Sequence, residues 1–274
     1  MKIAITGKGG VGKTLIASGI AFFLARAGYT TIAIDADPTP NLALSLGIPL
    51  NEANAILPVS ENSGLINAKT GTGFPGVYAL NFTVHDIVKK FSVPTPAGAN
   101  LLVMGMVKSM DSGCSCAANS VIRALIRHLI VERDEAVVLD MEAGLEHIGR
   151  GTAEGVDCMI VVSDANAKSL GTARIIAQMA RDFKIPGILM IGNRVQTPSQ
   201  EKIIQEYAEE QGLPVAGYVP FDPAVAEAGI AGESILALQG SPALDAIDRI
   251  GRMIMDTCNK DGRAQKKQEK RGMP

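Results

Sequence analysis

Residues 2–14 read KIAITGKGGVGKT, and this stretch decides the class of fold. Its start is a short apolar run typical of a buried strand, and a glycine-rich loop follows that ends in Lys13 and Thr14. The residues after the loop have a helical pattern that Gly28 is suited to end. A second apolar run at 31–34 completes the order strand, loop, helix, strand. This order predicts a parallel sheet with right-handed crossovers.

The rest of the chain continues this alternation. Further strands are expected at 101–104, 136–139, 159–162, 188–191 and 215–219, and helices at 14–27, 119–131, 169–183, 199–211 and 242–258. The sequence therefore predicts a single α/β domain, residues 1–258, whose mostly parallel sheet carries helices on both faces.

Two segments break the alternation. In residues 58–76, 12 of 19 positions are Gly, Pro, Ser, Thr or Asn, which predicts a long surface loop. Residues 259–274 hold six basic and two acidic residues and almost no apolar ones, which predicts a basic, disordered tail.

The composition excludes several classes of function. The 274 residues carry 26 basic and 28 acidic side chains, and only 4% are aromatic, so neither a cationic surface nor stacking platforms for nucleic acid are expected. Four cysteines are too few for a disulfide framework. The apolar run at 15–25 is too short to span a bilayer. We expect a cytoplasmic protein that binds neither nucleic acid nor membrane.

The glycine-rich loop fits the pattern G-x-x-x-x-G-K-[ST], in which backbone amides surround phosphate oxygens at a helix N-terminus. A structural glycine-rich turn would not require this order of strand, loop and helix. Lys13 is expected to reach the β and γ phosphates, and Thr14 to offer its hydroxyl to Mg²⁺. The candidate nucleotide-binding residues here are Gly7, Lys8, Gly9, Gly10, Val11, Gly12, Lys13, Thr14 and Leu15.

Carboxylates follow two of the expected strands. Asp140 ends an apolar run in the manner of a Walker B aspartate, which holds Mg²⁺. Asp35 and Asp37 lie beyond the second strand, at the edge where open α/β sheets bind ligands. The alternative for this pair is an Asx turn before Pro38.

Asn193 and Arg194 follow another strand, where nucleotide-binding sheets place an asparagine that reads the base. A guanine-specific N-K-x-D motif needs an aspartate at the place of Gln196. Its absence favours adenine, and therefore ATP.

Cys114 and Cys116 form a C-x-C pair among small residues that allow a turn, so both sulfurs could face one metal ion. Two such pairs in a two-fold dimer would supply four sulfurs, a set suited to Ni²⁺ or Zn²⁺. By itself, C-x-C is a weak signal, and a structural or incidental pair of cysteines is the alternative.

Lys8 gives the loop the form K-G-G-x-G-K-T, which resembles the deviant Walker A motif of the family that holds MinD, the nitrogenase iron protein and the arsenite-pump ATPase. The resemblance implies an ATPase in which Lys8 reaches the partner's nucleotide across a dimer, Asp37 orients the attacking water and Asp35 helps to hold Mg²⁺. Catalysis would then rest on Lys8, Lys13 and Asp37. It also implies a second adenine-contacting loop, for which an ordinary connection is the alternative. That loop is Pro220, Phe221 and Asp222.

The C-x-C pair, the helix after it and the sequence DMEAGLEH at 140–147 are together similar to the CooC-type maturation ATPases. These insert nickel into carbon monoxide dehydrogenase, and close relatives serve acetyl-CoA synthase. The resemblance implies a homodimer bridged by nucleotide and metal that ATP hydrolysis resets. One alternative is an Mrp-type iron–sulfur cluster carrier, which would normally show C-x-x-C. The other is a MinD-like regulator, which needs an amphipathic C-terminal helix that residues 265–274 do not encode.

Overall fold

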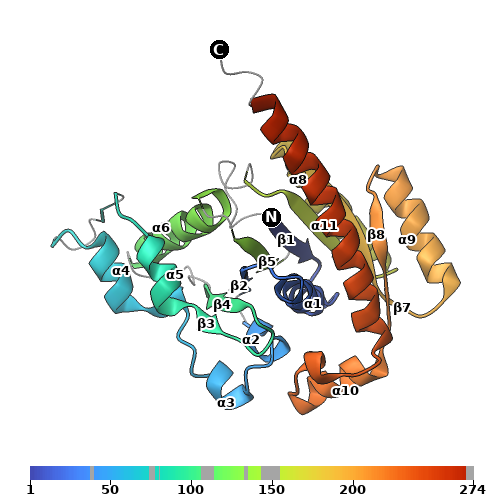
Figure 1. The fold of residues 1–274 in the computed structure, drawn as a ribbon, viewed down its shortest axis with the longest axis horizontal. Helices are drawn as coiled ribbons and strands as arrows, with labels where there is room; N and C mark the ends of the chain where they lie inside the picture. Colours follow the sequence, from blue (N-terminus) through green and yellow to red (C-terminus); the bar gives the residue numbers. More distant parts are fainter. Residues whose placement is uncertain are drawn as a thin grey trace.

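The computed structural model describes residues 1–37, 40–73, 78–79, 81–105, 114–132, 135–142 and 155–269, with the backbone alone for 114–116, 131–132 and 258–269. Its centre is one sheet in which the described strands have the order β3-β4-β2-β5-β1-β6-β7-β8 (Figure 1). The strands are β1 (Lys2–Gly7), β2 (Thr31–Ala36), β3 (Val93–Pro94), β4 (Asn100–Val103), β5 (Ala136–Met141), β6 (Cys158–Ser163), β7 (Gly187–Val195) and β8 (Val215–Pro220). Apart from the short antiparallel pair of β3 with β4, the described pairings between named strands are parallel.

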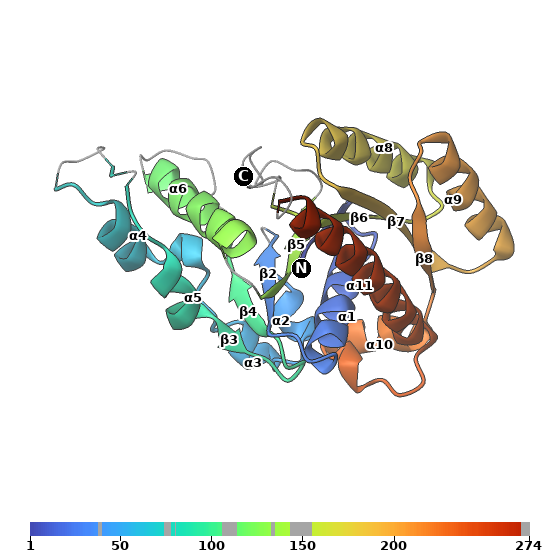
Figure 2. The same cartoon turned by 45° about the horizontal axis from the view of Figure 1, so that its top comes forward.

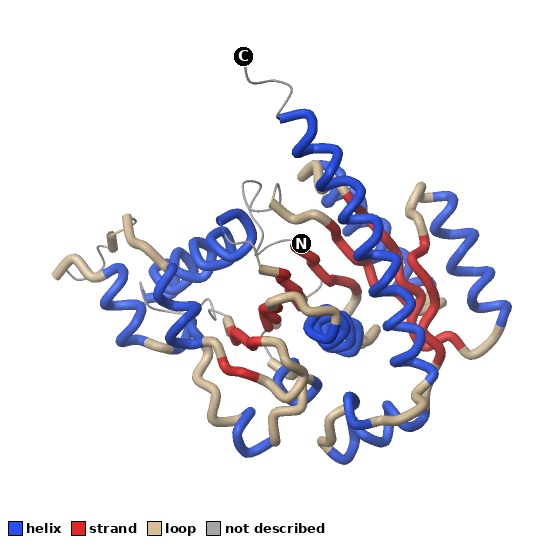
Figure 3. Tube along the Cα trace, viewed as in Figure 1, coloured by secondary structure: helices blue, strands red, loops and turns tan. Residues whose placement is uncertain are grey.

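Helices cover both faces of this sheet (Figure 3). They are α1 (Lys13–Arg26), α2 (Leu42–Ser45), α3 (Leu50–Ala53), α4 (Ser63–Thr70), α5 (His85–Phe91), α6 (Cys114–Arg127), α8 (Ala167–Asp182), α9 (Pro198–Glu210), α10 (Pro223–Ala231) and α11 (Pro242–Glu269). The 3₁₀ turns η1 (Val59–Glu61) and η3 (Ile235–Ala237) and the π-helical turn η2 (His128–Glu132) complete the described elements.

Each face of the sheet has its own hydrophobic core. The core on one face includes residues of α1 and α11 together with Ile3 and Ile5, and the core on the other face includes residues of α6, α8 and α9 together with Ile32 and Ile34 (Figure 2). Alternate side chains of a strand point to opposite faces, and here both faces are apolar, as expected for a parallel sheet buried between helices. The predicted fold class is therefore confirmed.

The predicted loop over 58–76 is wrong for residues 59–70, which form η1 and α4. Asn62, counted as a loop residue, caps α4 by accepting a hydrogen bond from the Leu65 amide at 2.9 Å. Val59 and Ile66 are buried in the core beneath α6. A segment rich in polar residues thus folds because a few apolar ones anchor it and a polar one caps it.

Two boundaries also differ from the prediction. Helix α6 begins at Cys114, so the C-x-C pair lies in its first turn rather than in a preceding turn. Helix α11 continues to Glu269, so the segment expected to be disordered from residue 259 begins as helix. Extending a helix that already exists costs little when the added residues are good helix formers such as Ala, Gln, Lys and Glu.

The topology brings the predicted site residues to one edge. Strand β1 lies between β5 and β6, and all three run in the same direction, so the loop after β1 lies beside the ends of both neighbours. Asp35 on β2 and Asp140 on β5 are direct register partners. The carboxyl edge of the sheet is therefore where a ligand would meet residues from distant parts of the sequence.

Candidate nucleotide-binding site

The loop between β1 and α1 has the backbone that a phosphate cradle requires. Gly10 (φ 82°) and Gly12 (φ 92°) adopt left-handed conformations that other residues rarely tolerate. Gly12 is the N-cap of α1, and no described side chain hydrogen-bonds to the amides of the helix's first turn. Those amides, with the positive end of the helix dipole, are available to phosphate oxygens.

Lys13 is buried, with 6% of its surface exposed, and its Nζ donates to the Lys8 carbonyl at 3.4 Å. The ammonium group therefore lies over the loop, where it would meet the outer phosphates. Lys8 is half-buried, and no interaction of its side chain with another described residue is found.

Asp140 ends β5 facing this loop, and 2% of its surface is exposed. The Thr14 hydroxyl lies near its carboxylate and favours the charged form, whereas Oδ1 has no hydrogen-bond partner among the described residues. Burial, with a smaller contribution from Asp35, raises the pKa of Asp140 to about 7, although Thr14 and Lys13 act to lower it. A buried carboxylate oxygen without a partner, next to a threonine hydroxyl, fits the oxygen ligands that Mg²⁺ prefers.

Asp35 is fully buried, and its carboxylate holds the chain that follows β2. Oδ1 accepts from the Asp37 amide at 3.1 Å, and Oδ2 accepts from the Leu42 amide at 2.9 Å. Burial raises the pKa of Asp35 to about 6, against these hydrogen bonds. Asp35 therefore shapes the loop that carries Asp37, and the role toward Mg²⁺ that the resemblance implies stays a prediction. The alternative of an Asx turn matches its contact with Asp37.

Asn193 lies directly behind the phosphate loop. It is buried, with 1% exposed, and its Nδ2 donates to the Val11 carbonyl at 2.7 Å. Its Oδ1 has no hydrogen-bond partner among the described residues. A Cβ added to Gly12 would collide with the same Nδ2. The structure thus brings the predicted base-reading asparagine against the loop.

Arg194 follows with a left-handed backbone (φ 57°), which is unusual for a residue other than glycine. The pairing of β7 with β8 is irregular between Gly192 and Val195, so the chain bulges at this point. The Arg194 side chain is exposed at the carboxyl edge.

The segment from Pro220 to Asp222 is tied to this edge, because the Phe221 amide donates to the Val195 carbonyl at 2.9 Å. Phe221 is 43% exposed. Asp222 is buried, and its carboxylate caps α10 at the Ala224 amide (3.0 Å) and accepts from the Ser241 hydroxyl (2.5 Å). The hydrogen bond from Ser241 is the main reason that the pKa of Asp222 lies below its usual range. The Asp222 carboxylate is thus engaged by groups of the fold itself. This favours the alternative of an ordinary connection between elements over a contact with the adenine.

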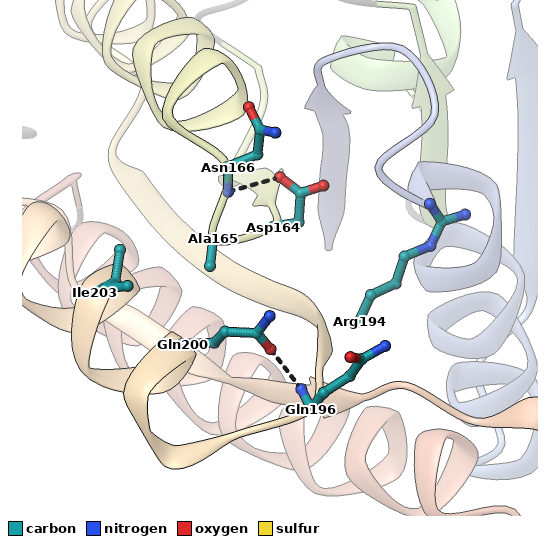
Figure 4. A pocket seen from close by; sticks show the side chains of 7 residues that line it. All are labelled: Asp164, Ala165, Asn166, Arg194, Gln196, Gln200 and Ile203. Carbon is teal, nitrogen blue, oxygen red and sulfur yellow. Dashed lines mark hydrogen bonds between the residues drawn. The ribbon is translucent and has the colours of Figure 1, made fainter.

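A recess of about 390 Å³ lies at the ends of β6 and β7 (Figure 4). It is called the β6–β7 recess below, and it is lined by Asp164, Ala165, Asn166, Arg194, Gln196, Gln200 and Ile203. Of these residues, only Arg194 and Gln196 belong to a predicted motif. Asp164 and Asn166 directly follow an apolar strand, the same signal that identified Asp35 and Asp140.

Some of the predicted residues lie in parts of the chain that the structure does not describe. The side chains of Cys114 and Cys116 lie outside the described residues, as do residues 143–154, which hold most of the sequence DMEAGLEH. Among the side chains that the structure describes, no group of three or more His, Cys, Asp or Glu residues could hold a metal ion. No helix in the described parts of the chain is both long and apolar enough to cross a membrane.

A phosphate loop at the start of α1, on a parallel sheet with these neighbours, is the arrangement of a P-loop nucleotide-binding protein. The family model described as the CobQ/CobB/MinD/ParA nucleotide binding domain matches residues 2–235, and the chain belongs to this family.

Individual relatives agree with this assignment. The chain is 43% identical over 247 residues to the carbon monoxide dehydrogenase accessory protein CooC of Rhodospirillum rubrum, which covers 89% of this chain and 91% of that protein. It is 41% identical to an uncharacterised ATP-binding protein of Methanocaldococcus jannaschii, over 94% of this chain and 99% of that protein. The predicted resemblance to CooC-type proteins is confirmed.

Among solved structures, the MinD cell division protein of Aquifex aeolicus superposes with a TM-score of 0.67, covering 93% of this chain and 97% of that one. At 19% sequence identity this likeness concerns the fold alone.

Proposed function

We propose that this chain is a dimerising ATPase that serves as an accessory protein in the maturation of carbon monoxide dehydrogenase or acetyl-CoA synthase, with nickel as its cargo. The observation that carries the ATPase part is the buried Asp140 carboxylate, whose Oδ1 lacks a described partner beside Thr14 and the phosphate loop. The client is proposed from the 43% identity to CooC, whose name states a role with carbon monoxide dehydrogenase.

The chain's own groups divide the work at the nucleotide. The open amides of α1 and the Lys13 ammonium bind the phosphates, and Asp37, held in place by Asp35, orients the attacking water. Asn193, which lies against the phosphate loop, is proposed to read the adenine, and Arg194 beside it lines the β6–β7 recess. Mg²⁺, held through Thr14 and Asp140, would neutralise charge on the phosphate oxygens.

Dimerisation is proposed from Lys8. Its ammonium has no interaction with any other described side chain, although it belongs to a loop in which Lys13 already supplies a cation. A second cation delivered only when two subunits meet would couple hydrolysis to assembly, as an arginine finger does.

Cargo binding is proposed at the start of α6. Cys114 and Cys116 of two subunits would give four thiolates, which suit Ni²⁺, with Zn²⁺ as the other candidate. We further propose that the protein works in the cytoplasm without contacting nucleic acid or membrane.

Two lysine variants test the nucleotide part, with ATP hydrolysis and ATP affinity measured separately. Lys13→Ala is expected to lose ATP binding by tenfold or more, because its ammonium meets the phosphates of its own subunit. Lys8→Ala is expected to bind ATP within a few-fold of the wild type and to lose most hydrolysis. Hydrolysis by Lys8→Ala at the wild-type rate would exclude a role in the partner's site. Comparable turnover of GTP would exclude adenine specificity.

A further inference from the structure

The β6–β7 recess carries two opposite charges that do not pair within the chain. Asp164 and Arg194 both line this recess (Figure 4). Neither forms an ion pair with another described residue. Oδ1 of Asp164 accepts from the Asn166 amide at 3.1 Å, a local turn that fixes its orientation and leaves its charge uncompensated.

Arg194 has a strained backbone conformation at this position. Its left-handed conformation lies within the β7–β8 bulge, while the neighbouring Asn193 is anchored to Val11. Such a conformation is strained in a residue other than glycine, and strained residues cluster at functional sites. The bulge fixes the direction of a long cationic side chain that nothing in the described chain engages.

The recess lies on the edge that the proposed dimer would bury. Strand β6 is the direct neighbour of β1, and β7 is the next strand outward. If Lys8 reaches the partner's nucleotide, the carboxyl edges of two sheets face each other, and the recess faces its own copy. Charges buried there without partners would oppose assembly. At the rim, Ile203 is 43% exposed and offers apolar surface to such a contact.

We propose that the β6–β7 recess is a self-complementary dimer contact, in which Asp164 of each subunit pairs with the partner's Arg194. A two-fold axis passing beside the recess makes both pairs at once, because each subunit presents one acid and one base. This inference rests on the proposed ATP-dependent dimer and names the contact that aligns it.

Reversal of each charge tests the pairing. Asp164→Arg places two cations at each contact, and Arg194→Asp places two carboxylates there. Asp is among the residues that tolerate a left-handed backbone, so the second change adds no strain. Each single variant should raise the dimer dissociation constant at least tenfold, measured by sedimentation with Mg²⁺ and saturating non-hydrolysable ATP analogue.

The rescue is the decisive measurement. An equimolar mixture of the two single variants should form a heterodimer, and the double variant a homodimer, each within about threefold of the wild-type dissociation constant. Asp164→Asn is the matched control, because it keeps an acceptor for the Asn166 amide and removes only the charge. It should weaken the dimer less than Asp164→Arg. Thermal melts of each variant verify the fold.

Three outcomes would overturn the contact. These are single reversals without effect, a mixture no tighter than either variant alone, and a double variant that stays monomeric while folded. If the wild type itself remains monomeric with Mg²⁺ and analogue, the proposed dimer and this contact fall together. If it dimerises and the reversals have no effect, only the contact is wrong.

Discussion

Two buried carboxylates lie side by side at the centre of the site. Asp35 and Asp140 are register partners on adjacent strands, and at most 2% of either is exposed. Burial raises the pKa of both, to about 6 and about 7. Asp35 offsets this with hydrogen bonds from two backbone amides, whereas Oδ1 of Asp140 has none from the described residues. In the metal-free protein, the charged form of Asp140 is thus less favourable than the charged form of Asp35.

This difference predicts how stability depends on pH in Asp140→Asn. Because the folded pKa lies above the unfolded value of 3.8, the folded state holds its proton longer, and wild-type stability falls as pH rises from about 4 to 7. An asparagine does not titrate. In EDTA, the variant should match the wild type near pH 4 and exceed it by more than about 1 kcal/mol at pH 8.

Denaturant melts across this pH range measure the effect. Saturating Mg²⁺ with nucleotide should reverse the order, because only the wild type gains binding energy from the ion. A variant that is less stable than the wild type at pH 8 in EDTA would mean that the carboxylate is needed for the fold itself.

At the scale of elements, the phosphate loop packs tightly against the end of β7. Gly12 caps α1, and Asn193 at the end of β7 lies where a Gly12 side chain would be. The same asparagine holds the Val11 carbonyl. The path of the loop therefore depends on a strand 180 residues further along the chain as well as on its glycines.

Gly12→Ala is expected to destabilise the nucleotide-free protein by about 2–3 kcal/mol, because it combines a left-handed backbone with displacement of the Asn193 amide. Gly9→Ala is the matched control. A Cβ on Gly9 meets no atom within 4 Å, and its backbone is not left-handed. Thermal melts without nucleotide compare the two, and equal stability of both variants would contradict the importance of the contact.

At the scale of the whole molecule, the sheet topology brings the site residues together. Parallel strands bring their carboxyl ends to one edge, so the phosphate loop, Asp37, Asp140, Asn193 and the β6–β7 recess meet although they are far apart in sequence. Helix α6, which begins with the C-x-C pair, packs on the face opposite α1. Metal and nucleotide, as proposed above, would both favour the same assembled dimer.

The expected consequence is linkage between the two ligands. A saturating ATP analogue should tighten binding of Ni²⁺ or Zn²⁺, and the metal should tighten the analogue by the same factor, expected to be about 5–150-fold. Equilibrium dialysis should find one metal per dimer, with affinity falling as pH drops because protons compete for the thiolates. Cys114→Ser and Cys116→Ser should each abolish metal-induced dimerisation and leave nucleotide binding intact. One metal per monomer, or tight metal binding by the double variant, would mean that the C-x-C pair is only part of a structural loop.

The sequence by itself determined the alternation of strands and helices, the phosphate loop and the position of Asp140. These depend on local rules: apolar runs form strands, glycines permit the cradle, and a polar residue after an apolar strand lies at its end. The tertiary structure decided how the other polar groups are used. Asp222 caps a helix because Ser241 and α11 lie beside it, and Asp35 holds its own loop. It also decided that residues 59–70 fold, because Val59 and Ile66 find a core beneath α6. A carboxylate or a short apolar cluster takes its role from what surrounds it, and for a parallel sheet those surroundings come from distant sequence that no local pattern contains.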